Sequence, residues 1–416
     1  MCARSGRGRR ASRNSAASDL PARSVSLSAV HVQSPAPYGI GNGDAWSEWP
    51  LLRQTEVVPY LLQRDLLHPA MVVEGDLLVT DASRRNRNFR VLSERGASYL
   101  LKQGIGNHGV RTVGHEAAVY RVLREDSGPT GIKRYLPTCH GYDSERGVLM
   151  LELLRGAESL REYHFRRHRF PTSLAKQLGE ALGGLHHEGR AAAHLTGAKG
   201  PAWVLSLHHP DVSIFREASA ANLQLIRLLQ GQEQFGHLLD ELHEGWTSDA
   251  FIHGDVKADN VIVFAPKASR RKTRLALVDW EMAGPGDACW DVGSVFGEYL
   301  ATWLLSMPIT GEAPPDRFVE LARYPLEAIQ PAVRAFWNAY VGRMGFDARS
   351  SHRRLTRSVR YGAARLLQTC YESSQATAHL LGTTRCMLQL SVNILRRPLE
   401  ASVHLLGIPL SESMPG

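Results

Sequence analysis

The sequence predicts an α+β protein in which a small β-rich lobe precedes a large, mainly helical lobe. Five short apolar stretches with strand character lie between residues 76 and 153, interrupted by one helical pattern. From Ser159 onward, apolar residues recur at helical spacing instead. The chain has 416 residues, 43% hydrophobic and 22% charged, which is enough for two to three structural units with a buried core.

The expected small lobe covers residues 47–155 and begins with a helix. The apolar residues of Glu56–Leu67 have helical spacing, and Pro59 suits a first turn. Val113–Arg124 is the second helix expected in this lobe. The five expected strands are Asp76–Val79, Phe89–Leu92, Ser98–Lys102, Thr138–Tyr142 and Val148–Leu153.

The expected helical lobe covers residues 156–416. A hairpin-like segment interrupts it, with the strand-like pieces Val261–Phe264 and Leu275–Val278 on either side of an exposed basic tip, Lys267–Arg274. Helical spacing of apolar residues predicts the helices Leu174–His187, Ala221–Leu242, Asp291–Leu305, Pro331–Met344, Ser351–Leu367 and Ala378–Leu395.

Two short segments account for the formal net charge of +8. The first thirty residues hold six arginines and one acid, and the tip Lys267–Arg274 holds five basic residues and no acid. Because the rest of the chain is near neutral, no nucleic-acid partner is expected. Residues 1–46 are basic, rich in Ser, Ala and Gly, and lack an apolar signal segment, so we expect a disordered basic tail.

Cysteine spacing and hydropathy favour a cytoplasmic protein. The five cysteines lie far apart with no CxxC pair, so neither a zinc site nor a disulfide framework is predicted. The pairs His186-His187 and His208-His209 lack an HExxH motif or a cysteine partner, and we interpret them as ordinary residues of the lobe. No apolar run reaches the ~18 residues of a membrane span, so no membrane partner is expected.

The strongest functional pattern is FIHGDVKADNVIV, residues 251–263. Asn260 follows Asp255 by five residues, and Asp279 closes a second strand, LALVDWE. An Asp, an Asn five positions on and a second Asp after a hairpin form the pattern of kinase catalytic and metal-binding loops. Phosphoryl transfer needs one carboxylate that orients a hydroxyl and accepts its proton, and hard oxygen ligands for Mg²⁺.

The HGD and DWE motifs resemble the aminoglycoside phosphotransferase and choline kinase-like family rather than ordinary protein kinases. The resemblance implies a protein kinase-like fold that binds ATP between its two lobes. It implies that Asp255 is the catalytic base and that His253 supports the catalytic loop. It also implies that Asn260 and Asp279 bind Mg²⁺.

The same resemblance assigns roles to two further segments. Gly286–Asp291 resembles the family's GDPxWD, whose second Asp, here Asp291, gives structural support to the catalytic loop; Ala288 replaces the Pro. The stretch LMLELLRG, residues 149–156, resembles the family's hinge LLLEWLPG. It implies that the backbone of Glu152 and Leu154 contacts adenine.

The small lobe carries residues suited to contact phosphates. A Lys on the third strand and a Glu on the next helix form the phosphate-holding pair of kinases, and Lys102 and Glu116 match these positions. The loop Thr80–Asn88 contains no glycine. Its side chains, Ser83 and Arg85 among them, are expected to contact phosphate instead of the backbone, although a solvated basic turn explains them equally well.

The acceptor is less well specified by these motifs. Small-molecule kinases of the family usually carry His two residues after the base, whereas this chain has Lys257, as in the DLKPEN motif of Ser/Thr protein kinases. Lys257 would touch the γ-phosphate and favours a Ser/Thr hydroxyl. Gly286–Pro308 and Cys386–Leu410 also resemble class V lanthipeptide and thioamitide kinases. That resemblance implies phosphorylation of a ribosomally made precursor peptide, from which a partner lyase then eliminates phosphate.

Three arginines, Arg353, Arg357 and Arg360, share one helix face and could dock an acidic peptide, although a solvated face is the simpler interpretation. Two other functional classes stay open. One is a kinase for a small hydroxyl compound such as an aminoglycoside, whose amines would suit the acids within Asp240–Asp249. The other is a catalytically silent binding subunit, against which the complete set of motif residues argues.

Overall fold

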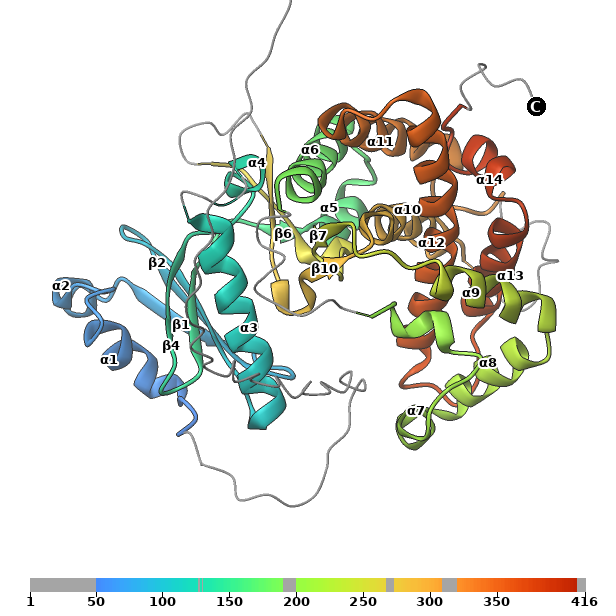
Figure 1. The fold of residues 1–416 in the computed structure, drawn as a ribbon. Coiled ribbons are helices and arrows are strands. Elements are labelled where there is room, and N and C mark those ends of the chain that lie inside the picture. The colour runs from blue at the N-terminus through green and yellow to red at the C-terminus, as the bar shows by residue number, and fades with distance from the viewer. Residues whose placement is uncertain are drawn as a thin grey trace, which may run out of the picture. The chain divides into compact units, whose positions relative to one another are not determined.

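The computed structural model describes residues 50–125, 128, 130–189, 200–266, 273–308 and 320–409. Within them, an N-terminal antiparallel sheet is followed by a mainly helical part, which confirms the predicted fold class (Figure 1). The predicted basic tail 1–46 and most of the basic tip, residues 267–272, lie outside the described residues. Among the described helices, none combines the length and apolarity needed to cross a bilayer.

The N-terminal sheet has five strands in the order β1-β2-β3-β5-β4, all paired antiparallel. Side chains alternate between its faces, so that Leu101 packs in one cluster with α1 (Val57–Leu62), while Lys102 lies on the opposite face, toward α3 (Gly106–Arg124). The strands are β1 (Leu77–Asp81), β2 (Arg87–Ser93), β3 (Tyr99–Gln103), β4 (Cys139–Asp143) and β5 (Val148–Glu152).

The helical part is organised around α10 (Ala288–Leu304), which is buried at every position; most of its residues are apolar, and its two acids, Asp291 and Glu298, have partners inside the protein. It packs against α12 (Ala348–Ser374), which in turn packs against α13 (Gly382–Arg396). The other helices of this part are α5 (Leu160–Arg167), α6 (Thr172–Glu188), α7 (Val212–Glu217), α8 (Ala220–Gln230), α9 (Glu233–Glu244), α11 (Gln330–Met344) and α14 (Pro398–His404).

The prediction of one continuous helix over Ala221–Leu242 is wrong. The chain forms α8 and α9 there, separated by Gly231 and Gln232. Glycine has about 1 kcal/mol less helix propensity than alanine, and Gln232 leaves the helical region at φ −122° and ψ 77°. The apolar spacing continues across the break because both helices bury a face, so periodicity alone does not reveal the turn.

Short strands hold the two predicted catalytic loops side by side. The HGDVKADN loop runs from β7 (Ala250–Ile252) to β8 (Val261–Phe264), and the DWE segment runs from β9 (Arg274–Leu277) to β10 (Gly284–Gly286). Strand β7 pairs with β10, and β8 pairs with β9 and β6 (Glu158–Ser159). Val278 N–H donates to Asn260 O at 3.0 Å, which joins the loops directly.

Helices α10 and α12 approach closely because glycines face each other across the contact. A Cβ on Gly293 would lie 2.6 Å from the Ser358 carbonyl oxygen and 2.8 Å from the Gly362 nitrogen. Backbone atoms cannot yield at such a distance as a flexible side chain can. The close contact brings the middle of α12 next to the helix whose first turn supports the catalytic loop.

We therefore expect Gly293→Ala to lower the free energy of unfolding by about 1–3 kcal/mol through overpacking. Gly342→Ala is the matched control, because it lies in α11 with no atom within 4 Å of an added Cβ. Its expected effect is a gain of up to about 1 kcal/mol from helix propensity. Urea unfolding of both variants measures the difference, and equal stabilities would contradict the close-contact argument.

Candidate active site

The backbone of the HGD segment is held by Asp291 in the first turn of α10. Its carboxylate accepts hydrogen bonds from His253 N–H at 2.7 Å and Gly254 N–H at 2.9 Å, and it contacts His186 Nε2 at 3.1 Å. Gly254 adopts φ +80°, and a Cβ there would lie 2.5 Å from the Met282 carbonyl oxygen. Only glycine fits this position, which explains why glycine stands between His253 and Asp255 in the motif.

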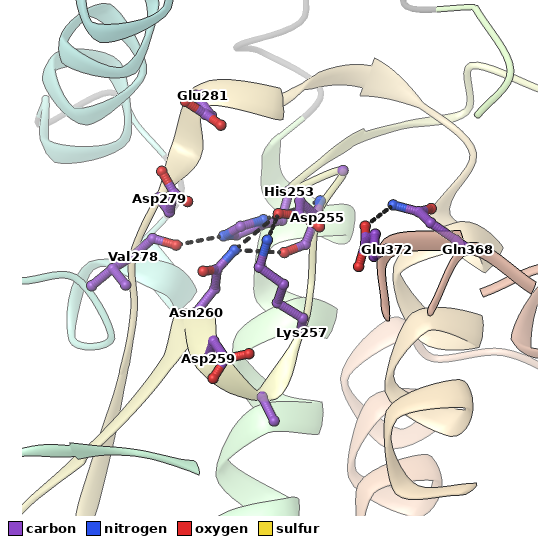
Figure 2. A network of polar contacts seen from close by, with 12 residues as sticks. His253, Asp255, Lys257, Asp259, Asn260, Val278, Asp279, Glu281, Gln368 and Glu372 are labelled. Atoms are coloured by element: carbon purple, nitrogen blue, oxygen red, sulfur yellow. Dashed lines mark hydrogen bonds and ion pairs between the residues drawn. The ribbon is translucent and has the colours of Figure 1, made fainter. Parts of the chain in front are cut away.

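Asp255 is surrounded by nitrogen donors (Figure 2). Lys257 Nζ lies 2.6 Å from Oδ2, Arg365 Nη1 lies 3.7 Å from Oδ1, and Asn260 Nδ2 donates to Oδ2 at 3.2 Å and to the Asp255 carbonyl at 2.9 Å. Burial opposes ionisation of Asp255, but Arg365 and Lys257 outweigh it and hold the pKa of this carboxyl below its ordinary value. The group is therefore an anion that can accept a hydrogen bond from a hydroxyl.

His253 connects the two catalytic loops. Its Nε2 lies 3.1 Å from the Val278 carbonyl oxygen, and its Nδ1 lies 3.4 Å from Asp255 N–H. The ring packs against Trp280 with centroids 4.5 Å apart. All of these partners belong to the protein backbone or core, and the role of His253 as a support of the catalytic loop stays a prediction.

Lys102 lies between two acids. Its Nζ is 2.7 Å from Glu116 Oε2 on α3 and 2.6 Å from Asp279 Oδ1 at the end of β9. Burial works against the ammonium charge, but Glu116 and Asp279 outweigh it and raise the pKa of Lys102. Glu116 Oε1 also accepts Trp280 N–H at 3.3 Å, which ties α3 to the DWE segment. Asp279 itself adopts a left-handed conformation, φ 68°, which is costly for a residue other than glycine and is common at functional sites.

Two hard oxygen atoms are available for a cation in this part of the site. Asn260 uses its Nδ2 for both contacts with Asp255, and Asp279 uses Oδ1 for Lys102. Within the described residues, neither Asn260 Oδ1 nor Asp279 Oδ2 accepts a hydrogen bond. Amide and carboxylate oxygens are ligands that Mg²⁺ prefers, so this donor set fits the predicted metal.

The glycine-free loop between β1 and β2 is ordered by its own side chains. Ser83 N–H donates to Asp81 Oδ1 at 2.8 Å, and Ser83 Oγ accepts Asn88 N–H at 3.1 Å. Arg85 forms an ion pair with both carboxylate oxygens of Glu281, which follows Asp279 by two residues. Arg85 would have to exchange this partner to bind phosphate, and phosphate contact by Ser83 and Arg85 stays a prediction.

In the hinge segment after β5, the two predicted adenine-contacting positions differ in whether their backbone N–H is already bonded. Glu152 N–H donates to the Thr138 carbonyl at 2.7 Å, and Leu153 N–H donates to the Ser98 carbonyl at 2.8 Å. Leu154 N–H makes no hydrogen bond within the part of the chain that the structure describes. Of the two positions predicted to contact adenine, Leu154 is therefore the one with a free N–H, and the contact itself stays a prediction.

Sequence reasoning missed a buried cation below the catalytic loop. Only 2% of the Arg365 side chain is exposed, although nothing in the sequence distinguishes it from the other arginines of α12. Its guanidinium lies 3.7 Å from Asp255, 3.6 Å from Glu298 and 3.6 Å from Glu372. Glu298 also accepts Ala258 N–H at 3.0 Å. Glu298 lies seven residues after Asp291 and therefore on the same face of α10. That spacing is the one sequence signal for a second acid near the catalytic loop, and such an acid needs a cationic partner.

The three arginines predicted to bind a peptide do not form a free basic face. Arg357 pairs with Asp287 at 2.5 Å, and Arg360 pairs with Glu241 at 2.6 Å. Arg353 is exposed. Two of the three guanidinium groups are thus occupied by acids of the same chain, and they would have to exchange these partners to dock an acidic peptide.

The sheet lobe, the helical lobe and the paired loops define a kinase-like phosphotransferase. A family model described as the phosphotransferase enzyme family matches residues 78–328, more than half of the chain. The chain belongs to this family of phosphotransferases, as the aminoglycoside phosphotransferase and choline kinase resemblance predicted. The matched residues include both catalytic loops. Comparison with curated protein sequences gives no match.

Several solved structures are similar to this chain at low sequence identity. A choline kinase from Cryptosporidium parvum Iowa II is 12% identical with a TM-score of 0.53, and the match covers 85% of this chain and 98% of that chain. The choline kinase LicA from Streptococcus pneumoniae is 13% identical with a TM-score of 0.44, covering 82% and 99%. A ternary complex of streptomycin, ATP and APH(2")-IIa is 13% identical with a TM-score of 0.45, covering 81% and 99%.

Asp291→Ala should lower the free energy of unfolding by about 2–4 kcal/mol, because it leaves the buried N–H groups of His253 and Gly254 without acceptors. Asp259→Ala, in the same loop region, removes only an ion pair with Arg161 in which the Asp side chain is 48% exposed. That control should lose about 1 kcal/mol or less. Chemical denaturation monitored by tryptophan fluorescence compares the two variants, and similar losses would disprove the supporting role of Asp291.

Arg365→Met should slow phosphotransfer at least about tenfold while leaving the affinity for MgATP within about threefold. A positive charge about 4 Å from a carboxylate interacts with it by on the order of 4 kcal/mol at an effective dielectric constant of 20. Each 1.36 kcal/mol added to the activation free energy slows the reaction by a factor of about ten, so loss of part of this interaction is enough for the expected effect. Steady-state ADP release gives kcat and the KM for ATP. Arg353→Met is the control on the same helix and should behave like the wild type; a parallel loss there would indicate a general effect of α12.

Proposed function

We propose that this protein transfers the γ-phosphoryl group of ATP to the hydroxyl of a small compound. The observation that carries the proposal is the anionic Asp255, held by Lys257, Arg365 and Asn260, together with Lys102, which pairs with Glu116 of the sheet lobe and Asp279 of the helical lobe. A phosphotransferase needs a group that orients the hydroxyl and cations that oppose the charge of the phosphates. In this chain Asp255 is the orienting group, and Lys102 and Lys257 are the cations.

Each of these side chains has a distinct task in the proposed reaction. Asp255 accepts a hydrogen bond from the attacking hydroxyl, orients it and receives its proton. Lys102, positioned by Glu116 and Asp279, contacts phosphate oxygens, and Lys257 offsets the negative charge that develops during transfer. Asn260 and Asp279 would hold Mg²⁺, which neutralises charge on the phosphates when bound.

Small hydroxyl compounds are favoured over peptides by two findings. A choline kinase matches this chain with a TM-score of 0.53. In addition, Arg357 and Arg360, which would have docked an acidic peptide, form ion pairs with Asp287 and Glu241. The argument for a free basic docking surface is correspondingly weaker.

A Ser/Thr hydroxyl of a precursor peptide is the second candidate acceptor. Lys257 favours it, because its Nζ lies 2.6 Å from Asp255, in the position of the lysine in the DLKPEN motif. The resemblance of Gly286–Pro308 and Cys386–Leu410 to lanthipeptide and thioamitide kinases points the same way. In that case a lyase would act on the phosphorylated peptide.

An acceptor screen separates the two proposals. Purified protein with MgATP is incubated with amino alcohols, aminoglycosides and amino sugars, and separately with Ser/Thr peptides that have acidic leaders. We expect a gain of one phosphate on a small hydroxyl compound, detected by mass spectrometry and ³¹P NMR. Efficient transfer to peptides alone would replace the first proposal by the second, and Asp255→Asn must abolish whichever transfer is seen.

The roles of the two aspartates are expected to separate in binding experiments. Asp255→Asn should retain MgATP affinity and lose about 10²–10⁴-fold in transfer rate, the usual range for removal of an acid–base group. Asp279→Ala should weaken MgATP binding as well, because it removes a cation ligand and a partner of Lys102. Isothermal titration calorimetry with MgATP measures the binding, and equal loss of affinity in both variants would contradict the assignment.

A further inference from the structure

We propose that His208, His209 and Asp240 form a zinc-binding site in the helical lobe, separate from the nucleotide site. Among the described residues, these three bring one potential ligand atom each to within 4.8 Å of one another. The sequence indicated no such role, because the carboxylate comes from a helix more than thirty residues further along the chain. The tertiary structure places it next to the histidine pair.

The cluster is built around a buried imidazole. His208 is 3% exposed, and its Nε2 lies 3.0 Å from Asp240 Oδ1. The rings of His208 and His209 have centroids 4.1 Å apart. Ligand atoms at about 2.0–2.2 Å around tetrahedral Zn²⁺ are separated by about 3.3–3.5 Å, so the three groups need only small movements to share one ion.

The surrounding chain fixes this arrangement before any ion binds. Gly236 lets α9 approach the imidazole, because a Cβ there would lie 3.0 Å from His208 Cδ2. Asp240 is four residues later and therefore on the same face of α9. The His208 carbonyl accepts Gln230 Nε2 at 3.2 Å, and His209 N–H donates to the Ser206 carbonyl at 2.9 Å. The backbone on both sides of the histidine pair is thus anchored.

One polar atom of the cluster lacks a partner. His208 Nδ1 is buried, and no hydrogen bond to it exists within the described residues. Buried side-chain nitrogen atoms are normally satisfied by protein, water or an ion. A simple His208–Asp240 hydrogen bond would tie the segment to α9, but it leaves the convergence of a second imidazole on the same carboxylate unexplained.

The donor set identifies the class of metal. Two imidazoles and one carboxylate suit Zn²⁺, with a water molecule in the fourth position, whereas Mg²⁺ prefers oxygen ligands alone. The ion would connect the segment after the 3₁₀ helix Trp203–Ser206 to α9. Helix α9 in turn contacts α12 through the Glu241–Arg360 ion pair, so the site would brace the lobe next to the helix that carries Arg365 (Figure 1).

Metal titration tests the proposal without any assumption about the acceptor. The full chain, freed of affinity-tag histidines and stripped with EDTA, is titrated with Zn²⁺ in excess Mg²⁺, which occupies oxygen-ligand sites. We expect one Zn²⁺ per chain, an increase in Tm, and tetrahedral visible absorption bands with Co²⁺. The variants His209→Ala and Asp240→Asn should each weaken binding at least about tenfold and lose the Tm increase.

The variants were chosen so that loss of folding does not imitate loss of binding. His209 is exposed and the Asp240 side chain is 41% exposed, so both substitutions should leave the metal-free Tm near that of the wild type. His243→Ala, an exposed histidine on the same helix, is the control and should bind Zn²⁺ normally. Absence of stoichiometric binding in the wild type, or wild-type affinity in both cluster variants, would overturn the proposal.

Discussion

The catalytic loop depends on one buried carboxylate. Asp291 accepts the N–H groups of His253 and Gly254, and it lies in the first turn of α10, where the helix dipole favours negative charge. Because α10 is buried along its whole length, the loop takes its position from the core of the helical lobe. The geometry around Asp255 therefore follows from core packing and not from contacts at the surface.

Alternating charge is the second constraint on the site. Anions and cations follow one another through the lobe without a large unpaired charge, in the order Asp259, Arg161, Glu298, Arg365, Asp255 and Lys257. Desolvated charges are costly unless partners lie close, and each member of this chain has such a partner. The arrangement keeps Asp255 ionised in a buried position, which is the state that a hydroxyl donor requires.

The sequence does not show which partners the arginines of α12 have, for one physical reason. Arg365, Arg357 and Arg360 belong to the same helix and look alike in the sequence, yet the first lies below the catalytic base and the other two bind acids of α9 and α10. Helical periodicity reports which residues share a face, but it does not report what that face contacts. Asp287 and Glu241, which pair with Arg357 and Arg360, come from segments that lie far away along the chain.

The sequence by itself determined the fold class, the strands of the small lobe and the catalytic pattern, because these depend on local spacing. Strand alternation places Lys102 on the side of the sheet that faces α3 and Glu116. The HGD and DWE motifs are short segments that form a tight turn and short loops. Only the tertiary structure decided which charges surround Asp255 and which histidines meet Asp240. Such contacts join segments distant in sequence, and the packing of whole helices and loops against one another, rather than any local pattern, brings them together.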